Sequence, residues 1–288
     1  MIYAICNPTA GHGRGKKVGR MIEEWLREKQ RPCRLLWTEY PGHGTELARK
    51  AGSEGAEMVI AIGGDGTAFE TAQGLLGTET PLAIIPAGTG NDFIKTIGVP
   101  SDPKEALEHV LSCKPQKTDA GMINDRMFLN EIGTGFDVMV LDYTQKAKKY
   151  ARGLLPYLYG VLQAMFRFRA MEITYTLEDG EEMHQRAFVM AAANGGYIGG
   201  GIRIAPDARV DDGLLDVVVV GDIPRRKLPL RLLGLLRGKI LSFPETQFHL
   251  VKMLTFTAEN MRLNIDGEVI SAQAAQVTIM PGSIWICR

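Results

Sequence analysis

The sequence predicts an α/β domain built on a parallel sheet, followed by an antiparallel β-rich domain. Over residues 1 to about 113, short apolar segments alternate with amphipathic helical segments, which is typical of a parallel sheet covered by helices. Further along, the strand-like segments alternate apolar with polar residues, and Asp-Gly pairs at 179–180 and 266–267 indicate hairpin turns. A chain of 288 residues suits two domains, which we place at 1–120 and 121–281, with 282–288 as a strand that could return to the first domain.

The elements of the first half follow from their residue patterns. Strands are expected at four apolar runs, 2–6, 34–37, 58–63 and 82–86. A first helix is expected because one apolar stripe at helical spacing lies opposite a charged stripe. The apolar stripe consists of Val18, Met21, Ile22, Trp25 and Leu26.

The second half contains two predicted helical segments, 145–167 and 225–241, among its strands. The chain is expected to end in two short strands, 275–280 and 284–287, separated by a turn at Pro281-Gly282.

Charge, hydrophobicity and cysteine spacing argue against several classes of function. Lys plus Arg and Asp plus Glu both number 33, so no excess of positive charge is available for general nucleic-acid binding. No apolar run approaches the ~20 residues of a membrane span, and we expect a cytoplasmic protein. The four cysteines are scattered without a Cys-x-x-Cys pair, so neither a zinc site nor a disulfide framework is indicated.

The run Gly-Gly-Asp-Gly-Thr at 63–67 directly follows a predicted buried strand. Glycines allow backbone N–H groups to approach an anion closely, and the N-terminus of the following helix favours negative charge. Thr67 is expected to cap that helix. The alternative is an ordinary turn, because Gly and Asp are common turn residues. The run favours a nucleotide phosphate site.

Further polar loops follow the other strands of the first half. Gly-Thr-Gly-Asn-Asp-Phe at 88–93 follows the fourth strand, a glycine-containing loop beginning at Asn7 follows the first, and Thr38 follows the second. Loops at the carboxyl ends of parallel strands face one crevice, so these segments are expected to converge on a shared ligand.

Taken together, these motifs resemble the diacylglycerol kinase catalytic domain family. The pattern consists of Asn7-Pro8, the 63–67 run, Pro-x-Gly-Thr-x-Asn-Asp-Phe at 86–93, Val-Asp-Asp-Gly-Leu-Leu-Asp-Val at 210–217 and Asp-Gly-Glu at 266–268. The chain is most similar to the soluble bacterial lipid kinases of this superfamily, which also includes sphingosine kinases. It departs from the pattern at Ile94 and Val269, where Ala and Pro are usual.

The resemblance implies an ATP- and Mg²⁺-dependent transfer of the γ-phosphoryl group to a lipid hydroxyl, diacylglycerol or a related lipid alcohol. It also implies that the second domain is a β-sandwich and that the active site lies in the cleft between the domains. One alternative is an NAD kinase-like enzyme, which shares the 63–67 run but lacks the 86–93 sequence. Another is a nucleotide- or lipid-binding module without turnover.

The resemblance implies roles for four acidic residues. Glu268 matches the family's proposed general base, the carboxylate that accepts the hydroxyl proton. Asp65, Asp92 and Asp119 match aspartates of a water and magnesium network between the domains. From the residues alone, a solvated strand residue after a turn is the favoured interpretation of Glu268, and Asp119 is equally well explained as a turn residue.

Binding residues are carried over in the same way. The expected nucleotide contacts are Asn7, Thr38, Gly63, Gly64, Asp65, Gly66, Thr67, Glu70, Gly88, Thr89 and Asn91. A structural magnesium ion is expected on the Asp212 side chain and on the Arg209 and Leu214 carbonyl oxygens, which are hard oxygen ligands. An Asp-Asp-Gly turn without metal is the alternative.

The two helical segments of the second half are candidates for transient membrane contact, because basic residues flank their apolar cores. The basic residues are Lys146, Lys148, Lys149, Arg152, Arg167, Arg169, Arg225, Arg226, Lys227, Arg231, Arg237 and Lys239, and the first core includes Leu154, Leu155, Tyr157, Leu158 and Phe166. A core helix with a solvated face is the alternative. The glycine run 194–201 is interpreted as a mobile loop or a rim of the substrate site. A homodimer is left open.

Overall fold

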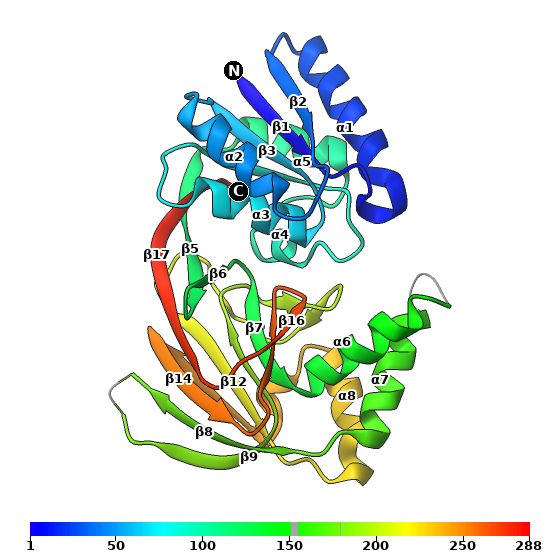
Figure 1. The fold of residues 1–288 in the computed structure, drawn as a ribbon, viewed down its shortest axis with the longest axis vertical. Helices are drawn as coiled ribbons and strands as arrows, with labels where there is room; N and C mark the ends of the chain where they lie inside the picture. Colours follow the sequence, from blue (N-terminus) through cyan, green and yellow to red (C-terminus); the bar gives the residue numbers. More distant parts are fainter. Residues whose placement is uncertain (151–154, 179) are drawn as a thin grey trace.

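The structure is a computed structural model that describes residues 1–150, 155–178 and 180–288. Three residues of the predicted elements, Arg152, Leu154 and Asp179, lie outside the described residues. Figure 1 shows an N-terminal half of strands flanked by helices above a C-terminal half dominated by longer strands. No helix among the described residues is long and apolar enough to cross a membrane.

The N-terminal half is a parallel sheet covered by helices, as predicted. Its strands are β1 (Ile2–Cys6), β2 (Cys33–Trp37), β3 (Met58–Gly63) and β4 (Leu82–Pro86), in the spatial order β2-β1-β3-β4. All three pairings are parallel. The helices are α1 (Ala10–Glu28), α2 (His43–Ser53), α3 (Asp65–Leu75), α4 (Asp92–Thr96) and α5 (Pro103–Ser112).

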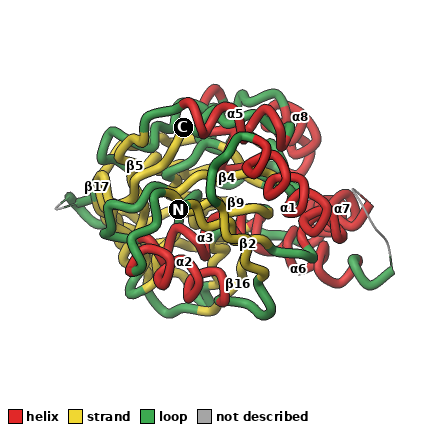
Figure 2. The backbone as a smooth tube through the Cα atoms, turned by 90° about the horizontal axis from the view of Figure 1, so that it is seen from above, coloured by secondary structure: helices red, strands yellow, loops and turns green. Residues whose placement is uncertain are grey.

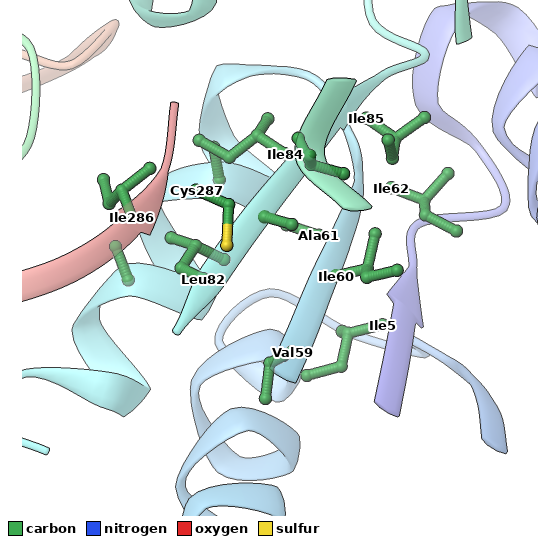
Figure 3. Close-up of a cluster of buried hydrophobic side chains, with 14 of the residues drawn as sticks. Ile5, Val59, Ile60, Ala61, Ile62, Leu82, Ile84, Ile85, Ile286 and Cys287 are labelled. Atoms are coloured by element: carbon green, nitrogen blue, oxygen red, sulfur yellow. The ribbon is translucent and has the colours of Figure 1, made fainter. Parts of the chain in front are cut away.

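The core of this half lies around the central strands. Strands β1, β3 and β4 are buried along their whole length, which explains their unbroken apolar sequence. Figure 3 shows side chains of β3 and β4 packed beside Ile286 and Cys287 from the end of the chain. The C-terminal residues therefore help to close the core of the N-terminal half.

The C-terminal half is antiparallel, as predicted. Its strands are β5 (Pro115–Ile123), β6 (Arg126–Phe128), β7 (Glu131–Gly135), β8 (Met171–Leu177), β9 (Met183–Ala193), β10 (Tyr197–Ile198), β11 (Ile202–Arg203), β12 (Leu215–Gly221), β13 (Thr246–Val251), β14 (Met253–Ala258), β15 (Arg262–Ile265), β16 (Glu268–Ser271) and β17 (Ala275–Cys287). β15 and β16 form the predicted hairpin, with positive φ at both Asp266 and Gly267.

The helices of this half differ from the prediction. The first segment begins earlier and forms two helices, α6 (Phe136–Ala147) and α7 (Leu155–Arg167). The start of α6 is rich in β-branched and aromatic residues, which suggest a strand, but Phe136 and Val140 are spaced one helical turn apart and both are buried. The second segment is short, with 3₁₀ turns on either side of α8 (Leu228–Leu236), which stops before Gly238 at φ 69°.

The last strand corrects the predicted ending. β17 is one strand rather than two, and its register against β5 shifts between Met280 and Ile284. Pro281 and Gly282 lie at this irregularity, where a residue without an N–H group and one at φ 56° are tolerated. β17 also pairs with β14 and, through Ile286, with β4, so it runs through both halves (Figure 1).

Candidate functional site

Two glycine loops meet at the carboxyl ends of β3 and β4. Gly64 precedes α3 and Gly88 follows β4. A Cβ built on Gly88 would lie 2.4 Å from the Gly64 Cα, so the loops have no room for a side chain where they touch. Because β3 and β4 are parallel neighbours, both loops lie at the same edge of the sheet. They form one backbone surface in front of the N-terminus of α3.

Thr67 does not cap α3, contrary to the prediction. The helix begins at Asp65 with Gly64 as its cap residue, and Thr67 lies buried in the first turn. Its side chain packs against the end of β3, because a Cβ on Gly63 would stand 2.2 Å from the Thr67 Oγ1. Thr67 therefore requires glycine at position 63.

Asp65 joins the two loops. Its Oδ1 accepts hydrogen bonds from the backbone N–H groups of Asp92 (2.7 Å) and Phe93 (3.1 Å) at the start of α4. Its Oδ2 lies beside Gly90, 3.0 Å from where a Cβ would stand. Burial, together with the nearby Asp92 charge, raises the pKa of Asp65 above its ordinary value. A cation next to this carboxylate would offset both effects.

Asp92 connects the N-terminal half to the C-terminal half. Its Oδ1 accepts from the Lys95 Nζ at 2.8 Å, and its Oδ2 accepts from the N–H group of Gly200 at 2.7 Å. Lys95 also donates to the Gly90 carbonyl oxygen at 2.9 Å. Lys95 was not among the predicted site residues, although its place two residues after the Asn-Asp-Phe sequence could have indicated it. The lysine supplies a positive charge at the glycine loop.

The first part of the glycine run 194–201 is fixed rather than free. Asn194 is fully buried, and its Nδ2 donates to the carbonyl oxygens of Asp119 (3.0 Å) and Leu129 (2.8 Å). The Gly196 N–H group donates to the Thr96 Oγ1 at 2.9 Å. Together with the bond from Gly200 to Asp92, these contacts hold the run against α4.

Other predicted nucleotide contacts have local partners. Both Glu70 oxygens accept N–H groups at the start of α2, from Gly42 and Gly44 at 2.9 Å each. Glu70 therefore holds the N-terminus of α2. Asn7 accepts from Thr9, and Thr38 pairs with the end of β1 through its backbone.

Asn91 and its neighbours shape the second loop. Asn91 has φ 50° and donates to the Gly88 carbonyl oxygen at 3.0 Å, while its buried Oδ1 has no hydrogen-bond partner. Thr89 and Gly66 are exposed, and a Cβ on Gly66 would meet no atom within 4 Å. Open space therefore adjoins the first turn of α3.

The turn between β15 and β16 presents two carboxylates with different surroundings. Asp266 accepts N–H groups from Leu129 (2.6 Å), Asn130 (2.9 Å) and Glu131 (2.9 Å), and burial raises its pKa to about 6. Glu268, the predicted base, has a side chain that is 68% exposed and forms an ion pair with Arg126. Asp266 thus anchors the turn, and Glu268 extends from it.

Sequence reasoning missed a pair of carboxyl groups beneath this turn. The Asn264 Nδ2 donates to the Glu131 Oε1 at 2.7 Å and to the Asp137 Oδ2 at 3.2 Å. A Cβ on Gly133 would lie 2.4 Å from the Asp137 Oδ2 and 3.2 Å from the Glu131 Oε2, so the glycine makes room for both groups. The only sequence signal is an acidic residue at the start of an otherwise uncharged strand.

This pair predicts a pH dependence of stability. Burial raises the pKa of Asp137 from 3.8 to about 6, and burial with the charges of Asp137 and Asp266 raises that of Glu131. A carboxyl group whose pKa is higher in the folded state stabilises the fold below its unfolded pKa and loses that contribution as pH rises through the folded pKa. Stability should therefore fall between pH 4 and pH 6, and Asp137→Asn should remove about 1–3 kcal/mol of this fall. Urea unfolding of both proteins at pH 4 and pH 7 measures this difference in the free energy of unfolding. Equal slopes in both proteins would contradict the assignment.

Asp119 organises the predicted magnesium loop through hydrogen bonds to its backbone and to the backbone of β17. Its Oδ2 accepts from the Gly213 N–H group at 2.8 Å and its Oδ1 from that of Gly282 at 2.6 Å. Asp212 is exposed, and its Oδ1 accepts a hydrogen bond from the Leu214 N–H group at 3.0 Å. The Arg209 Nε lies 3.4 Å from the Asp211 Oδ1. Among the described residues, no group of three or more His, Cys, Asp or Glu side chains is placed to hold a metal.

Asp216 adds a carboxylate to this loop that the prediction omitted. It is buried, and its Oδ2 has no hydrogen-bond partner. Burial, with the charges of Asp212 and Asp207, raises its pKa to about 7. An unpartnered carboxylate oxygen near a second acidic side chain is compatible with a cation at the loop.

The contact between the glycine loops gives a steric prediction. Gly88→Ala should separate the loops, because the new Cβ would overlap the Gly64 backbone, and nucleotide affinity should fall by about tenfold or more. Gly52→Ala in α2 is the control, since its Cβ would meet its nearest atom at an ordinary 3.4 Å. Titration calorimetry with ATP compares the two variants. Unchanged affinity in Gly88→Ala would show that the contact does not shape the nucleotide site.

Comparisons with known proteins match the whole chain. The diacylglycerol kinase catalytic domain matches residues 1–123, and the YegS C-terminal NAD kinase beta sandwich-like domain matches residues 130–288. A YegS-like lipid kinase of Chromohalobacter salexigens is 34% identical over 261 residues, which cover 87% of this chain and 81% of that protein.

Solved structures agree with this match. A diacylglycerol kinase structure from Bacillus anthracis has a TM-score of 0.82 and 26% identity, covering 99% of this chain and 96% of that one. An NAD kinase of Archaeoglobus fulgidus in complex with ATP shares the fold, with a TM-score of 0.56, 16% identity and coverage of 100% and 94%. The second half is thus a β-sandwich of the NAD kinase type. The chain belongs to the family of diacylglycerol kinase-like lipid kinases that includes the YegS-like proteins.

Proposed function

We propose that this kinase transfers the γ-phosphoryl group of ATP to the hydroxyl of a membrane lipid, diacylglycerol or a related lipid alcohol, with Mg²⁺. One observation carries the proposal: the Asp65 carboxylate binds both backbone N–H groups at the start of α4 and so locks two phosphate-binding loops together. Phosphoryl transfer depends mainly on positioning and on charge neutralisation, which a rigid pair of glycine loops can supply.

The ATP phosphates would lie over the two loops in front of α3. Gly64 and Gly88 carry no side chains of their own where the loops touch, and space adjoins Gly66. Lys95 lies at the rim through its bond to the Gly90 carbonyl oxygen and would neutralise phosphate charge. The A. fulgidus NAD kinase, which shares the fold, was solved in complex with ATP.

Magnesium fits the chemistry of two positions. Asp65 and Asp92 are neighbouring carboxylates at the loops, and a cation that binds phosphate oxygens would offset their repulsion. Asp212 and Asp216 are the candidate side chains at the second position, and the family resemblance adds the carbonyl oxygens of Arg209 and Leu214. When bound at the loops, Mg²⁺ would neutralise charge on the phosphates.

The acceptor hydroxyl would approach from the C-terminal half. Glu268 extends from a turn that Asp266 anchors, and we assign to Glu268 the removal of the hydroxyl proton. Tyr157 lies on this side too: burial raises its pKa to about 12, with smaller effects from the charges of Asp92 and Asp137. A neutral tyrosine hydroxyl could therefore donate a hydrogen bond to the acceptor or to a phosphate.

A lipid panel tests the proposal. Purified protein, radiolabelled ATP and Mg²⁺ are incubated with diacylglycerol, undecaprenol, a sphingoid base or NAD, and labelled products are separated by thin-layer chromatography. We expect label in one lipid product and none in NAD. Label in NAD would favour the NAD kinase alternative, and no labelled product with any acceptor would favour a binding module.

The proposed lipid acceptor is located in a bilayer, so the enzyme must bind at a membrane surface to reach it. We assign this contact to the helices α6, α7 and α8 of the C-terminal half, which carry Lys146, Arg167 and Arg231, and to the basic residues described next to their ends. Association with the membrane would be peripheral and reversible.

A further inference from the structure

Helix α7 exposes an apolar stripe along its whole length. Five large apolar or aromatic side chains at helical spacing are between 46% and 70% exposed: Leu155, Leu158, Tyr159, Leu162 and Phe166. Their spacing of three and four residues places them on one face. Burying such a face would be favourable, since each large apolar side chain contributes roughly 1.5–3 kcal/mol when it leaves water.

The opposite face of α7 already packs inside the protein. Gly160 and Ala164 are buried, and Gly160 lies so close to α6 that a Cβ would stand 2.6 Å from the Val140 carbonyl oxygen. α7 therefore cannot rotate to hide the stripe without losing this packing. Figures 1 and 2 both place α6 and α7 at the edge of the molecule.

Basic and aromatic groups border the stripe. Arg167 donates to the Tyr143 hydroxyl at 3.1 Å, and the Tyr143 ring packs edge-on against Tyr159 with ring centroids 6.3 Å apart. The Lys146 Nζ lies over the same Tyr143 ring at 5.3 Å. Tyrosine rings with cations beside them suit the boundary between lipid headgroups and acyl chains.

A pocket of about 460 Å³ opens where the C-terminal end of α7 meets the start of α8. Arg169, Arg186 and Arg225 come to it from three different segments, with Phe188 and Leu228 among its apolar lining. Asp222 lies 2.9 Å from Arg186 and balances that charge, while Arg169 and Arg225 remain as exposed positive groups. An anionic headgroup with an apolar body complements such a lining.

We infer that the α7 stripe and the arginine-lined pocket at its end form one docking surface for an anionic phospholipid bilayer. The stripe enters the acyl boundary, and the pocket accepts a phosphate-bearing headgroup. This inference rests on the proposed function, because the docking surface would serve to bring the active site to a lipid acceptor in the bilayer. The bilayer is the occupant because a protein partner would not require positive charge beside an apolar stripe on a solvent-exposed edge.

Vesicle co-sedimentation without ATP tests the surface independently of catalysis. Wild type should bind vesicles of phosphatidylcholine with phosphatidylglycerol more tightly than vesicles of phosphatidylcholine alone. Leu162→Glu/Phe166→Glu should weaken binding to both by roughly tenfold or more. Arg169→Ala/Arg225→Ala should remove the preference for the anionic vesicles and leave binding to neutral ones unchanged.

Matched controls use exposed residues elsewhere. Phe248→Glu/Leu250→Glu changes two residues of β13 that are 36% and 51% exposed, and it should bind like wild type. Circular dichroism and a thermal melt confirm that each variant folds. If the α7 variant sediments like the β13 control, or the arginine variant keeps the anionic preference, the docking surface is wrong.

Activity on a short-chain, water-soluble diacylglycerol separates this inference from the proposed function. The α7 variant should keep wild-type turnover on the soluble lipid and lose it on vesicles. Normal vesicle binding by a wild-type protein that phosphorylates no lipid would overturn the proposed function and leave the docking surface in place. Equal loss of turnover on both lipids would contradict docking as the role of α7.

Discussion

Asp65→Asn should lower kcat for phosphoryl transfer by about 10²–10³-fold, because it removes the carboxylate that we propose holds the Mg²⁺ needed to neutralise phosphate charge. The asparagine oxygen can still accept the N–H groups of Asp92 and Phe93, so the two glycine loops should stay together. The change therefore removes the carboxylate charge and the second oxygen beside Gly90 while keeping the backbone geometry. Steady-state kinetics over a range of Mg²⁺ concentrations measures the effect, and the Mg²⁺ requirement should rise.

Asp102→Asn provides a matched control in the same half. Asp102 caps α5 by accepting N–H groups from Lys104 and Glu105, and asparagine is an equally good cap. Its variant should keep wild-type kcat and stability. Wild-type kcat in Asp65→Asn would mean that Asp65 serves only to join the loops.

The strands of the N-terminal half could be predicted because burial on both faces leaves an unbroken apolar run with clear ends. β3 and β4 match the predicted bounds for this reason. β17 shows the limit of the same reasoning. Pro281-Gly282 indicates a turn locally, but β5 and β4 lie alongside and keep the strand continuous through the irregularity. Pairing with distant strands therefore determines that β17 is one continuous strand.

Some residues of the candidate site could likewise be predicted from the sequence, and others could not. The 63–67 and 86–93 motifs are local in sequence, and the structure brings them into contact. Glu131 and Asp137 gain their significance from Asn264, more than a hundred residues away, so no local pattern identifies them. Glu70 is a nucleotide contact that the family resemblance predicts, and its partners in the structure, the N–H groups of Gly42 and Gly44 at the start of α2, could not be predicted from local sequence.

Substitutions of the two carboxylates at the β15–β16 turn should have different effects, one on kcat and the other on folding stability. Glu268→Gln should lower kcat by about 10²–10⁴-fold, the range for losing a general base, and should leave ATP affinity and folding stability unchanged because the side chain is exposed. Asp266→Asn should instead lower the free energy of unfolding by about 1–3 kcal/mol, since one of the two oxygens that accept its three N–H groups becomes an NH₂ group and leaves a buried N–H group without an acceptor.

A substitution at Arg126 provides a second test of Glu268 as the general base. Its guanidinium pairs with Glu268 and holds that carboxylate in one position beyond the turn. Arg126→Gln removes this partner but keeps the carboxylate, so it should retain most of the wild-type kcat, whereas Glu268→Gln should lose it. If Glu268→Gln retains full activity while Asp266→Asn loses it without losing stability, the proton acceptor is the carboxylate inside the turn rather than the one beyond it.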